Sequence, residues 1–272
     1  MVHWVRATVL PVAALGVAVT LAACGGGSGR SAQDILSDAP ARTLAEGTVR
    51  VAISASLAGG GAGPSFEGEG EFDFDGHRGR LVLTGGGASE IRFLGSVVFV
   101  KLAQLSARPW LRLDVEELSA RPGVDLESLR QLQRNDPTAV LNYLRGATDD
   151  VEEVGTETVR GDTTTRYSAT LDLDKAAAKA EPEVREDIRR IVRELGTSRL
   201  PTEAWIDEEG RLRRLRYTLD LADLADAGSR PIGGKFTASF ELFQFGRPVE
   251  VADPPADEVT DLSDLIAAPP PG

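Results

Sequence analysis

Apolar and polar side chains alternate with a period of two over much of this chain. Between residues 49 and 57 the apolar positions are Val49, Val51, Ile53, Ala55 and Leu57. This period is typical of a β-strand with one buried face. The same alternation, or a short apolar run between turns, recurs at residues 66–75, 81–83, 91–94, 97–102, 110–113, 151–159, 165–173, 202–206, 215–221 and 236–242. The chain is therefore expected to form about ten or eleven strands, many of them joined by hairpin turns.

One of these strands departs from its own alternation. Leu215, Tyr217 and Leu219 share a face, but Leu212 is out of step with them by one residue. A β-bulge near Arg213 would restore the register.

Two segments carry helical signals instead. Asp136 followed by Pro137 is a good helix start, and Gly146 follows the last apolar residue, so the sequence predicts a short helix over residues 137–145. A second helical region is expected over residues 174–195, restarted at Pro182. The predicted fold class is α+β: a strongly curved antiparallel sheet, a half-barrel, with helices covering its concave face.

Such a concave face can leave an apolar pocket between sheet and helices. The candidate lining residues are apolar positions that the alternation places on inward strand faces. They are Val51, Ile53, Phe72, Phe74, Val98, Val100, Tyr167, Leu171, Tyr217, Leu219, Phe236 and Phe240. The same residues could equally form a filled core with no vacant volume, and the pattern alone leaves both interpretations open.

The first residues indicate export. Residues 7–23 are almost entirely apolar but too short for a bilayer-spanning helix, as expected of a signal peptide. The run ends at Leu21-Ala22-Ala23-Cys24, which fits a bacterial lipobox, so we expect cleavage between Ala23 and Cys24 and a diacylglycerol thioether on Cys24. The alternative is ordinary cleavage near Ala23 with a free thiol. Cys24 is the only cysteine, so no internal disulfide can form.

The domain organisation follows from these boundaries. We expect a signal peptide at residues 1–23, a lipidated cysteine with a flexible tether at 24–45, a folded domain at 46–252 and an acidic, proline-rich tail at 253–272. The net charge of −12 makes the chain repel nucleic acid, so no nucleic-acid partner is expected.

The sequence contains no complete motif for catalysis, metal binding or phosphate binding. The two histidines, His3 and His77, cannot make a histidine-based triad or a multi-histidine metal site. A calcium-loop pattern beginning at Glu71 places Val82 at its last ligand position, and Gly228–Lys235 departs from a phosphate loop in spacing. We therefore expect no catalytic residue, metal or cofactor. A hydrolase acting through Glu152 or Glu153 is a weaker alternative, because acidic residues on an exposed strand are usually solvated.

Several segments resemble the LppX/LprAFG family of actinobacterial lipoproteins, whose fold is similar to LolA and LolB. They are the lipobox, residues 97–102 after the Gly95 turn, 136–141, 151–155, and 200–207 with Gly210 and Arg214-Leu215. The resemblance covers residues 46–250 and implies the fold more strongly than the ligand. It also implies lipid or acylated-glycolipid binding between sheet and helices, and transport within the cell envelope.

Two functions are therefore expected as alternatives. The first is a non-enzymatic lipid carrier, held at the extracytoplasmic face of the cell membrane through diacylglyceryl-Cys24, with an envelope transporter as a candidate partner. The second is an envelope interaction module with a filled core that binds a protein partner.

Overall fold

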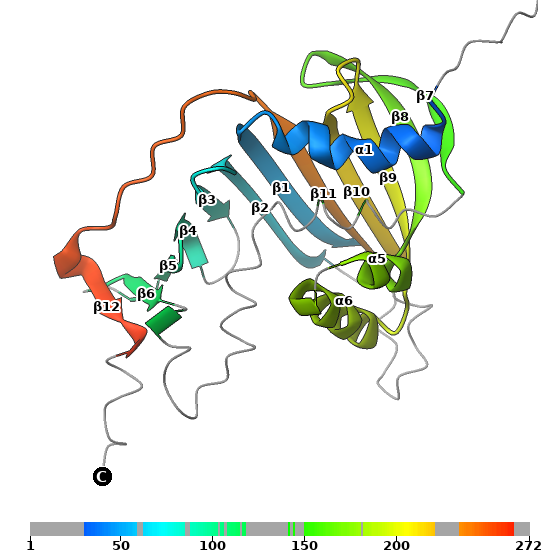
Figure 1. Cartoon of the computed structure of the whole chain (residues 1–272). Helices are drawn as coiled ribbons and strands as arrows, with labels where there is room; N and C mark the ends of the chain where they lie inside the picture. The colour runs from blue at the N-terminus through cyan, green and yellow to red at the C-terminus, as the bar shows by residue number, and fades with distance from the viewer. Residues whose placement is uncertain are drawn as a thin grey trace, which may run out of the picture.

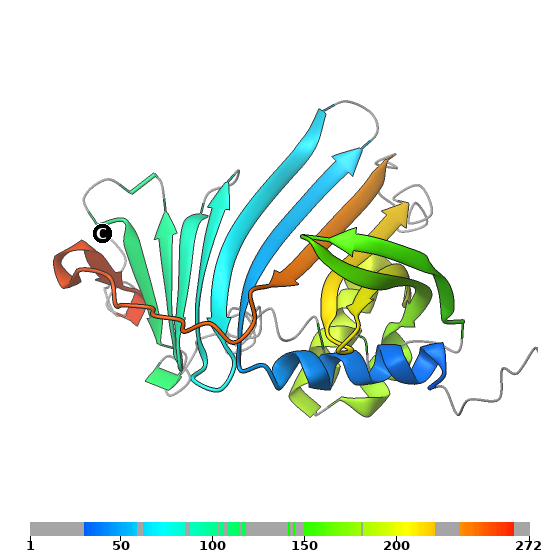
Figure 2. The same ribbon diagram turned by 90° about the horizontal axis from the view of Figure 1, so that it is seen from above.

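A computed structural model describes residues 30–58, 62–84, 88–102, 104–105, 108–114, 116–117, 141, 144, 150–180, 182–220 and 234–263. The expected signal peptide and Cys24 lie outside these residues. The described strands form one curved sheet of 12 strands in the order β12-β6-β5-β4-β3-β2-β1-β11-β10-β9-β8-β7 (Figures 1 and 2). All pairings are antiparallel except the parallel pair of β12 with β6. The predicted α+β class with a curved antiparallel sheet is confirmed.

The strands lie close to the segments that the alternation predicts. Their bounds are β1 Thr48–Ala58, β2 Ala62–Asp73, β3 Arg78–Thr84, β4 Ala88–Leu94, β5 Val97–Leu102, β6 Trp110–Asp114, β7 Glu152–Val159, β8 Asp162–Asp172, β9 Arg199–Asp207, β10 Leu212–Asp220, β11 Lys235–Phe243 and β12 Val259–Asp261. The register between β9 and β10 shifts between Leu212 and Arg214. The predicted bulge is therefore present.

Helices lie on one face of the sheet, which we call the inner face (Figure 1). Helix α1 (Ala32–Leu44) crosses it above β9 and β10. Helices α5 (Leu173–Lys179) and α6 (Pro182–Leu195) form a pair at the other end of these strands. A short 3-10 helix, η2 (Ala256–Glu258), precedes β12. No helix among the described residues has the length and apolar character needed to cross a membrane.

Helix α1 corrects the expected tether. Ser31 caps the helix: its hydroxyl accepts a hydrogen bond from the Asp34 backbone N–H at 3.1 Å, and the Asp34 carboxylate accepts one from the Ser31 backbone. Leu36 and Ala39 are fully buried. The chain from residue 32 to 44 is therefore part of the folded core.

The C-terminal segment also departs from the expected domain boundary at residue 252. After β11 it runs along the ends of the neighbouring strands to the far edge of the sheet, where β12 joins β6 (Figure 2). Arg92 donates a hydrogen bond to the Ala252 carbonyl oxygen at 2.7 Å on the way. The folded domain thus extends beyond residue 252 to at least residue 263.

The helix predicted over residues 137–145 lies largely outside the described residues. Leu141 and Leu144, which are described, are helical and almost fully buried in the core. The helical region predicted at 174–195 is present as α5 and α6.

Candidate functional site

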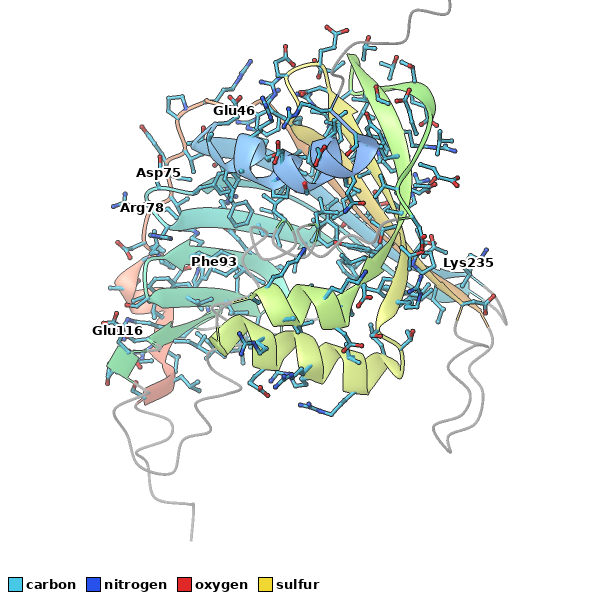
Figure 3. All side chains as sticks on the ribbon, turned by 45° about the vertical axis from the view of Figure 1, so that its right-hand side comes forward. Glu46, Asp75, Arg78, Phe93, Glu116 and Lys235 are labelled. Atoms are coloured by element: carbon cyan, nitrogen blue, oxygen red, sulfur yellow. The ribbon has the colours of Figure 1, made fainter. Side chains whose placement is uncertain are left out.

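The inner face gathers all twelve candidate pocket residues. Strand pairing aligns them across the sheet: Val51 lies opposite Leu242, Ile53 opposite Phe240, and Phe240 in turn opposite Leu215. On the next strands Leu219 faces Phe236 and Tyr167 faces Ala204. The alternation in the sequence therefore placed these twelve residues on one face of the sheet, and their role as a lipid pocket stays a prediction. Figure 3 shows labelled Phe93 on this side, between the sheet and the helices.

Three buried clusters divide this face. The first lies under α1 and includes Val51, Phe72 and Tyr167, with Phe74 and Tyr217 packed against it. The second lies under α5 and α6 and includes Leu171 and Leu219, with Phe236 at its margin. The third joins Val98 to Leu113, with Val100 packed beside them. Much of the candidate pocket is thus packed core.

A strip of half-buried apolar side chains lies between the first two clusters, and Tyr217 packs against both. It consists of Ile53, Tyr217, Phe236 and Phe240, and we call it the inner strip. Tyr217 and Phe240 meet edge to face with ring centroids 6.2 Å apart, whereas Ile53 and Phe240 belong to none of the three clusters. Phe66, which continues the same face on β2, is 42% exposed. These side chains therefore remain partly exposed on the inner face.

Glycines on β2 shape the inner face beside this strip. The pattern of β2 places Gly68 and Gly70 inward, opposite Ile53 and Val51. A Cβ at Gly68 would lie 2.8 Å from Leu83 Cδ2, 3.0 Å from the Val82 carbonyl oxygen and 3.1 Å from Ile53 Cγ1, so neighbouring atoms fill the space that a larger residue would need. The absence of side chains lets Ile53 and Leu83 approach each other across β2.

On the inner face, the surroundings of Tyr167 shift the pKa of its phenol. Burial raises the pKa of its phenol, the nearby Glu153 carboxylate adds to the rise, and a hydrogen bond with Thr165 opposes it. The phenol therefore remains protonated and uncharged at neutral pH, as an apolar surface requires.

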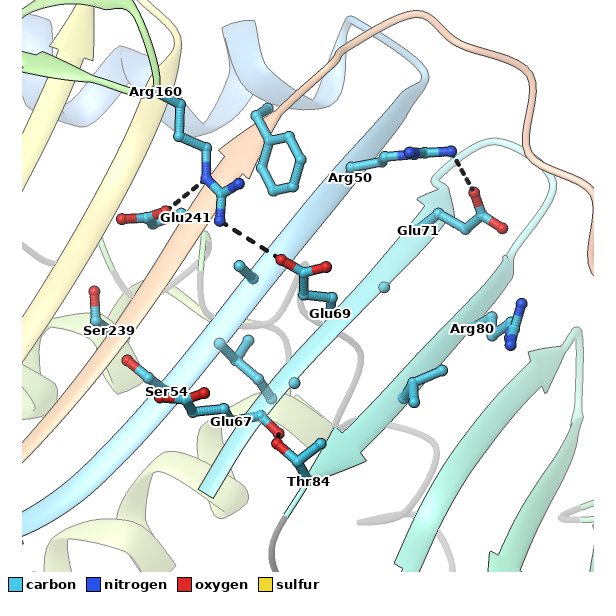
Figure 4. A pocket seen from close by; sticks show the side chains of 16 residues that line it. Arg50, Ser54, Glu67, Glu69, Glu71, Arg80, Thr84, Arg160, Ser239 and Glu241 are labelled. Carbon is cyan, nitrogen blue, oxygen red and sulfur yellow. Dashed lines mark hydrogen bonds and ion pairs between the residues drawn. The ribbon is translucent and has the colours of Figure 1, made fainter. Parts of the chain in front are cut away.

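The opposite, outer face carries a groove that sequence reasoning missed. It has a volume of about 770 Å³ and runs over β1, β2 and β11, with the helices behind the sheet in Figure 4. Arg160, from the turn between β7 and β8, projects over it. Arg160 Nε donates a hydrogen bond to Glu241 at 2.7 Å, and its guanidinium lies 3.9 Å from the Phe243 ring centroid.

The hairpin of β7 and β8 is fixed onto the outer face by polar contacts. Trp205 Nε1 donates a hydrogen bond to Glu157 at 2.8 Å, and this bond is the main cause of the lowered pKa of Glu157. At the hairpin tip Asp162 pairs with the buried Arg213. The hairpin therefore forms one wall of the groove and brings Arg160 to β11.

The described residues contain no group of three or more His, Cys, Asp or Glu side chains that could hold a metal ion. Glu152 and Glu153 are exposed on β7 and lie apart from both the inner strip and the groove. Among the described residues, the structure does not assemble Glu152 and Glu153 with other side chains into a catalytic site.

Comparison with known proteins gives the following relatives. No family model matches the chain. An uncharacterized 31.2 kDa protein of the rplA-rplJ intergenic region of Streptomyces griseus is 23% identical over 168 residues, covering 60% of this chain and 52% of that protein. The chain thus spans about half the length of this curated relative.

Solved structures similar to this chain include actinobacterial lipoproteins. LppX from Mycobacterium tuberculosis matches with a TM-score of 0.44 and 19% identity, covering 80% of this chain and 98% of LppX. LprF from Mycobacterium bovis has a TM-score of 0.42 and 16% identity, covering 82% and 96%. A LolA superfamily protein from Nitrosomonas europaea has a TM-score of 0.29 and 12% identity, covering 82% and 96%.

Proposed function

We propose that this protein is a cell-envelope lipoprotein that binds the acyl chains of a lipid or acylated glycolipid on the inner face of its sheet and carries them within the envelope. The observation that carries the proposal is the inner strip, where four large apolar side chains on β1, β10 and β11 remain half-buried. A filled core would bury these residues as completely as Val51 or Leu215.

The physical driving force is the burial of hydrocarbon. Each CH₂ group removed from water contributes about 0.8 kcal/mol, so a single acyl chain along the strip gains several kcal/mol. Polar headgroups would remain in water at the end of the strip, beyond Phe66. This role requires no cofactor and no catalytic residue.

Lipidation of Cys24 would keep the inner face close to the membrane. Only residues 25–31 separate Cys24 from the start of α1. Such a segment reaches at most about 25 Å when fully extended. Because α1 packs on the inner face, the anchor would hold the lipid site near the bilayer surface from which a lipid is taken.

Mass spectrometry of bound lipid tests the proposal. Protein carrying Cys24→Ala, which cannot be acylated there, is purified and extracted with organic solvent. The extract is expected to contain phospholipid or glycolipid in stoichiometric amount, and delipidated protein is expected to take up a fluorescent fatty acid. Protein that is empty in repeated preparations and takes up no probe would falsify the proposal.

A second candidate is the envelope interaction module. The three buried clusters favour it, because they fill much of the inner face. In that case the chain would bind a protein such as an envelope transporter, and crosslinking in cells would capture a specific partner while the lipid extract stays empty.

A further inference from the structure

The groove lies on the outer face of the sheet, opposite the inner strip, and shares only Ile53 with that strip. Ala52, Ser54 and Ser239 provide its floor on β1 and β11. These short side chains leave a hollow between longer ones, with a volume of about 770 Å³. Binding sites for small ligands are typically concave spaces of roughly 300–1,000 Å³. The groove is therefore large enough for a short segment of polypeptide.

One wall of the groove is a row of carboxylates. Glu67, Glu69 and Glu71 alternate with inward glycines along β2, so all three point to the outer face. Alternate residues of a strand are spaced by about 7 Å. The row therefore presents negative charge at regular intervals along the groove.

Two of these carboxylates, Glu67 and Glu69, are incompletely neutralised by neighbouring cations. Glu71 lies 3.8 Å from Arg50, whereas Glu69 is 75% exposed and, among the described residues, forms an ion pair only with Arg160, at 3.9 Å. Glu67 forms no ion pair with the described part of the chain, and only its backbone oxygen accepts a hydrogen bond, from Thr84. The groove thus retains capacity for additional positive charge.

A cation of the chain itself already occupies part of the groove (Figure 4). The guanidinium of Arg160 lies between Glu241 and Glu69 and stacks on the Phe243 ring at 3.9 Å. Arg160 reaches this place from a hairpin at the far edge of the sheet. A guanidinium held between two carboxylates and over an aromatic ring shows directly which chemistry this space accommodates.

We propose that the groove binds an extended, basic segment of a partner protein in which lysine or arginine occupies alternate positions. Same-side residues of an extended segment repeat at about 7 Å, which equals the spacing of Glu67 and Glu69. One cation of the segment pairs with Glu67, and the next displaces Arg160 from Glu69. The net charge of −12 favours the approach of such a segment.

Titration with synthetic peptides tests the inference. The complete chain carrying Cys24→Ala is titrated, by calorimetry at low and physiological salt, with a short peptide in which Lys and Gly alternate. Glu67→Gln/Glu69→Gln is expected to weaken binding roughly tenfold, as for the loss of two partly exposed ion pairs. Both residues are exposed, so these changes leave the fold intact.

Glu152→Gln/Glu153→Gln is the matched control. It removes the same charge from exposed positions on β7 outside the groove and is expected to leave affinity unchanged. Arg160→Gln is expected to tighten binding several-fold, because it releases Glu69 and Glu241 for the peptide.

Three results would overturn the inference. The first is no binding at low salt, and the second is an equal loss of affinity in both double variants, which would indicate attraction by net charge alone. The third is equal affinity for a peptide of the same composition with contiguous lysines. Fatty-acid uptake is expected to be the same in all of these variants, so failure here is separable from failure of the proposed lipid site.

Discussion

The Thr43 hydroxyl near the end of α1 accepts a hydrogen bond from the Leu212 backbone N–H at 2.9 Å and donates one to the Ala39 carbonyl oxygen at 2.7 Å. Thr43 and Leu212 are both fully buried. The hydroxyl thus joins α1 to the first residue of β10, next to the bulge between β9 and β10. It satisfies a backbone donor that would otherwise lie unpaired in the core.

Thr43→Val is therefore expected to lower the free energy of unfolding by about 1–3 kcal/mol, because it leaves the Leu212 N–H without an acceptor. Thr43→Ser keeps the hydroxyl and loses one methyl group, so a cost of about 1 kcal/mol is expected. Urea denaturation followed by circular dichroism measures both. Equal losses in the two variants would contradict a role for the hydrogen bond.

The two inward glycines of β2 are expected to differ in their tolerance of a side chain. A Cβ at Gly70 would collide with the backbone carbonyl oxygen of Arg80, whereas at Gly68 the nearest atom is the end of the flexible Leu83 side chain. Gly70→Ala should therefore cost about 2 kcal/mol and Gly68→Ala clearly less. Thermal unfolding of both variants measures the difference. A larger loss of stability for Gly68→Ala than for Gly70→Ala would contradict the close contact between Gly70 and the Arg80 carbonyl oxygen.

The proposed lipid site predicts a difference between the two faces of the sheet. The strand registers place Ile53 on the inner face, opposite Phe240, whereas Val82 lies opposite Glu69 on the outer face and is 38% exposed. Ile53→Asp places a charge along the acyl chain and is expected to lower the affinity for a fluorescent fatty acid at least tenfold, since a buried unpaired charge costs several kcal/mol. Val82→Asp should leave it unchanged. Equal effects would argue against binding on the inner face.

Stability is expected to depend on pH through Glu241. Burial alone would raise the pKa of its carboxyl, but hydrogen bonds from Arg160 and Arg214 lower it below the ordinary value of 4.5. A lowered pKa in the folded state means that the carboxylate stabilises the protein above pH 4.5 and loses this effect as the pH falls through the folded-state pKa. The melting temperature of the native chain should therefore exceed that of Glu241→Gln at neutral pH.

This difference in melting temperature should shrink as the pH falls below 4.5. Glu152→Gln, at an exposed position on β7, serves as the control and should follow the native chain at every pH. A difference that is independent of pH would indicate that Glu241 acts by packing rather than by charge.

The sequence predicts the strands well because each strand has one buried face, and burial imposes a period of two. It even locates the bulge at Leu212, since the bulge changes which residue points inward. Helix α1 was missed although Ser31 and Asp34 form a capping box, a local signal of a helix start. The Gly-rich segment before it and Pro40 inside it favour a flexible tether when only composition is considered.

The outer groove could not be predicted, because it depends on how the β7–β8 hairpin folds over the sheet. Arg160 and Glu241 are separated by 81 positions along the chain. The alternation of apolar and polar residues does not indicate that a turn residue such as Arg160 contacts β11, which lies beyond β9 and β10 in the sheet. The row Glu67, Glu69 and Glu71 was visible as the polar half of a strand, but the hollow beside it results from small residues on other strands.

Strand β12 supplies a last prediction. It has only three residues and pairs in parallel with β6, so its backbone hydrogen bonds alone hold it weakly. Asp261 strengthens the pair: it accepts a hydrogen bond from Arg112 at 2.6 Å and one from the Ser263 backbone N–H at 2.8 Å. Burial alone would raise the pKa of the Asp261 carboxyl, but these hydrogen bonds lower it below its ordinary value.

Asp261→Ala is therefore expected to release the C-terminal edge without unfolding the domain. Hydrogen exchange followed by mass spectrometry should show faster exchange in β12 and β6, with β8 and β9 unchanged, because local opening is independent of the rest of the sheet. Thr260→Ala, at the preceding position of β12, keeps the ion pair and should exchange like the native chain. Uniformly faster exchange over the whole sheet would instead mean that β12 is needed for the stability of the entire domain.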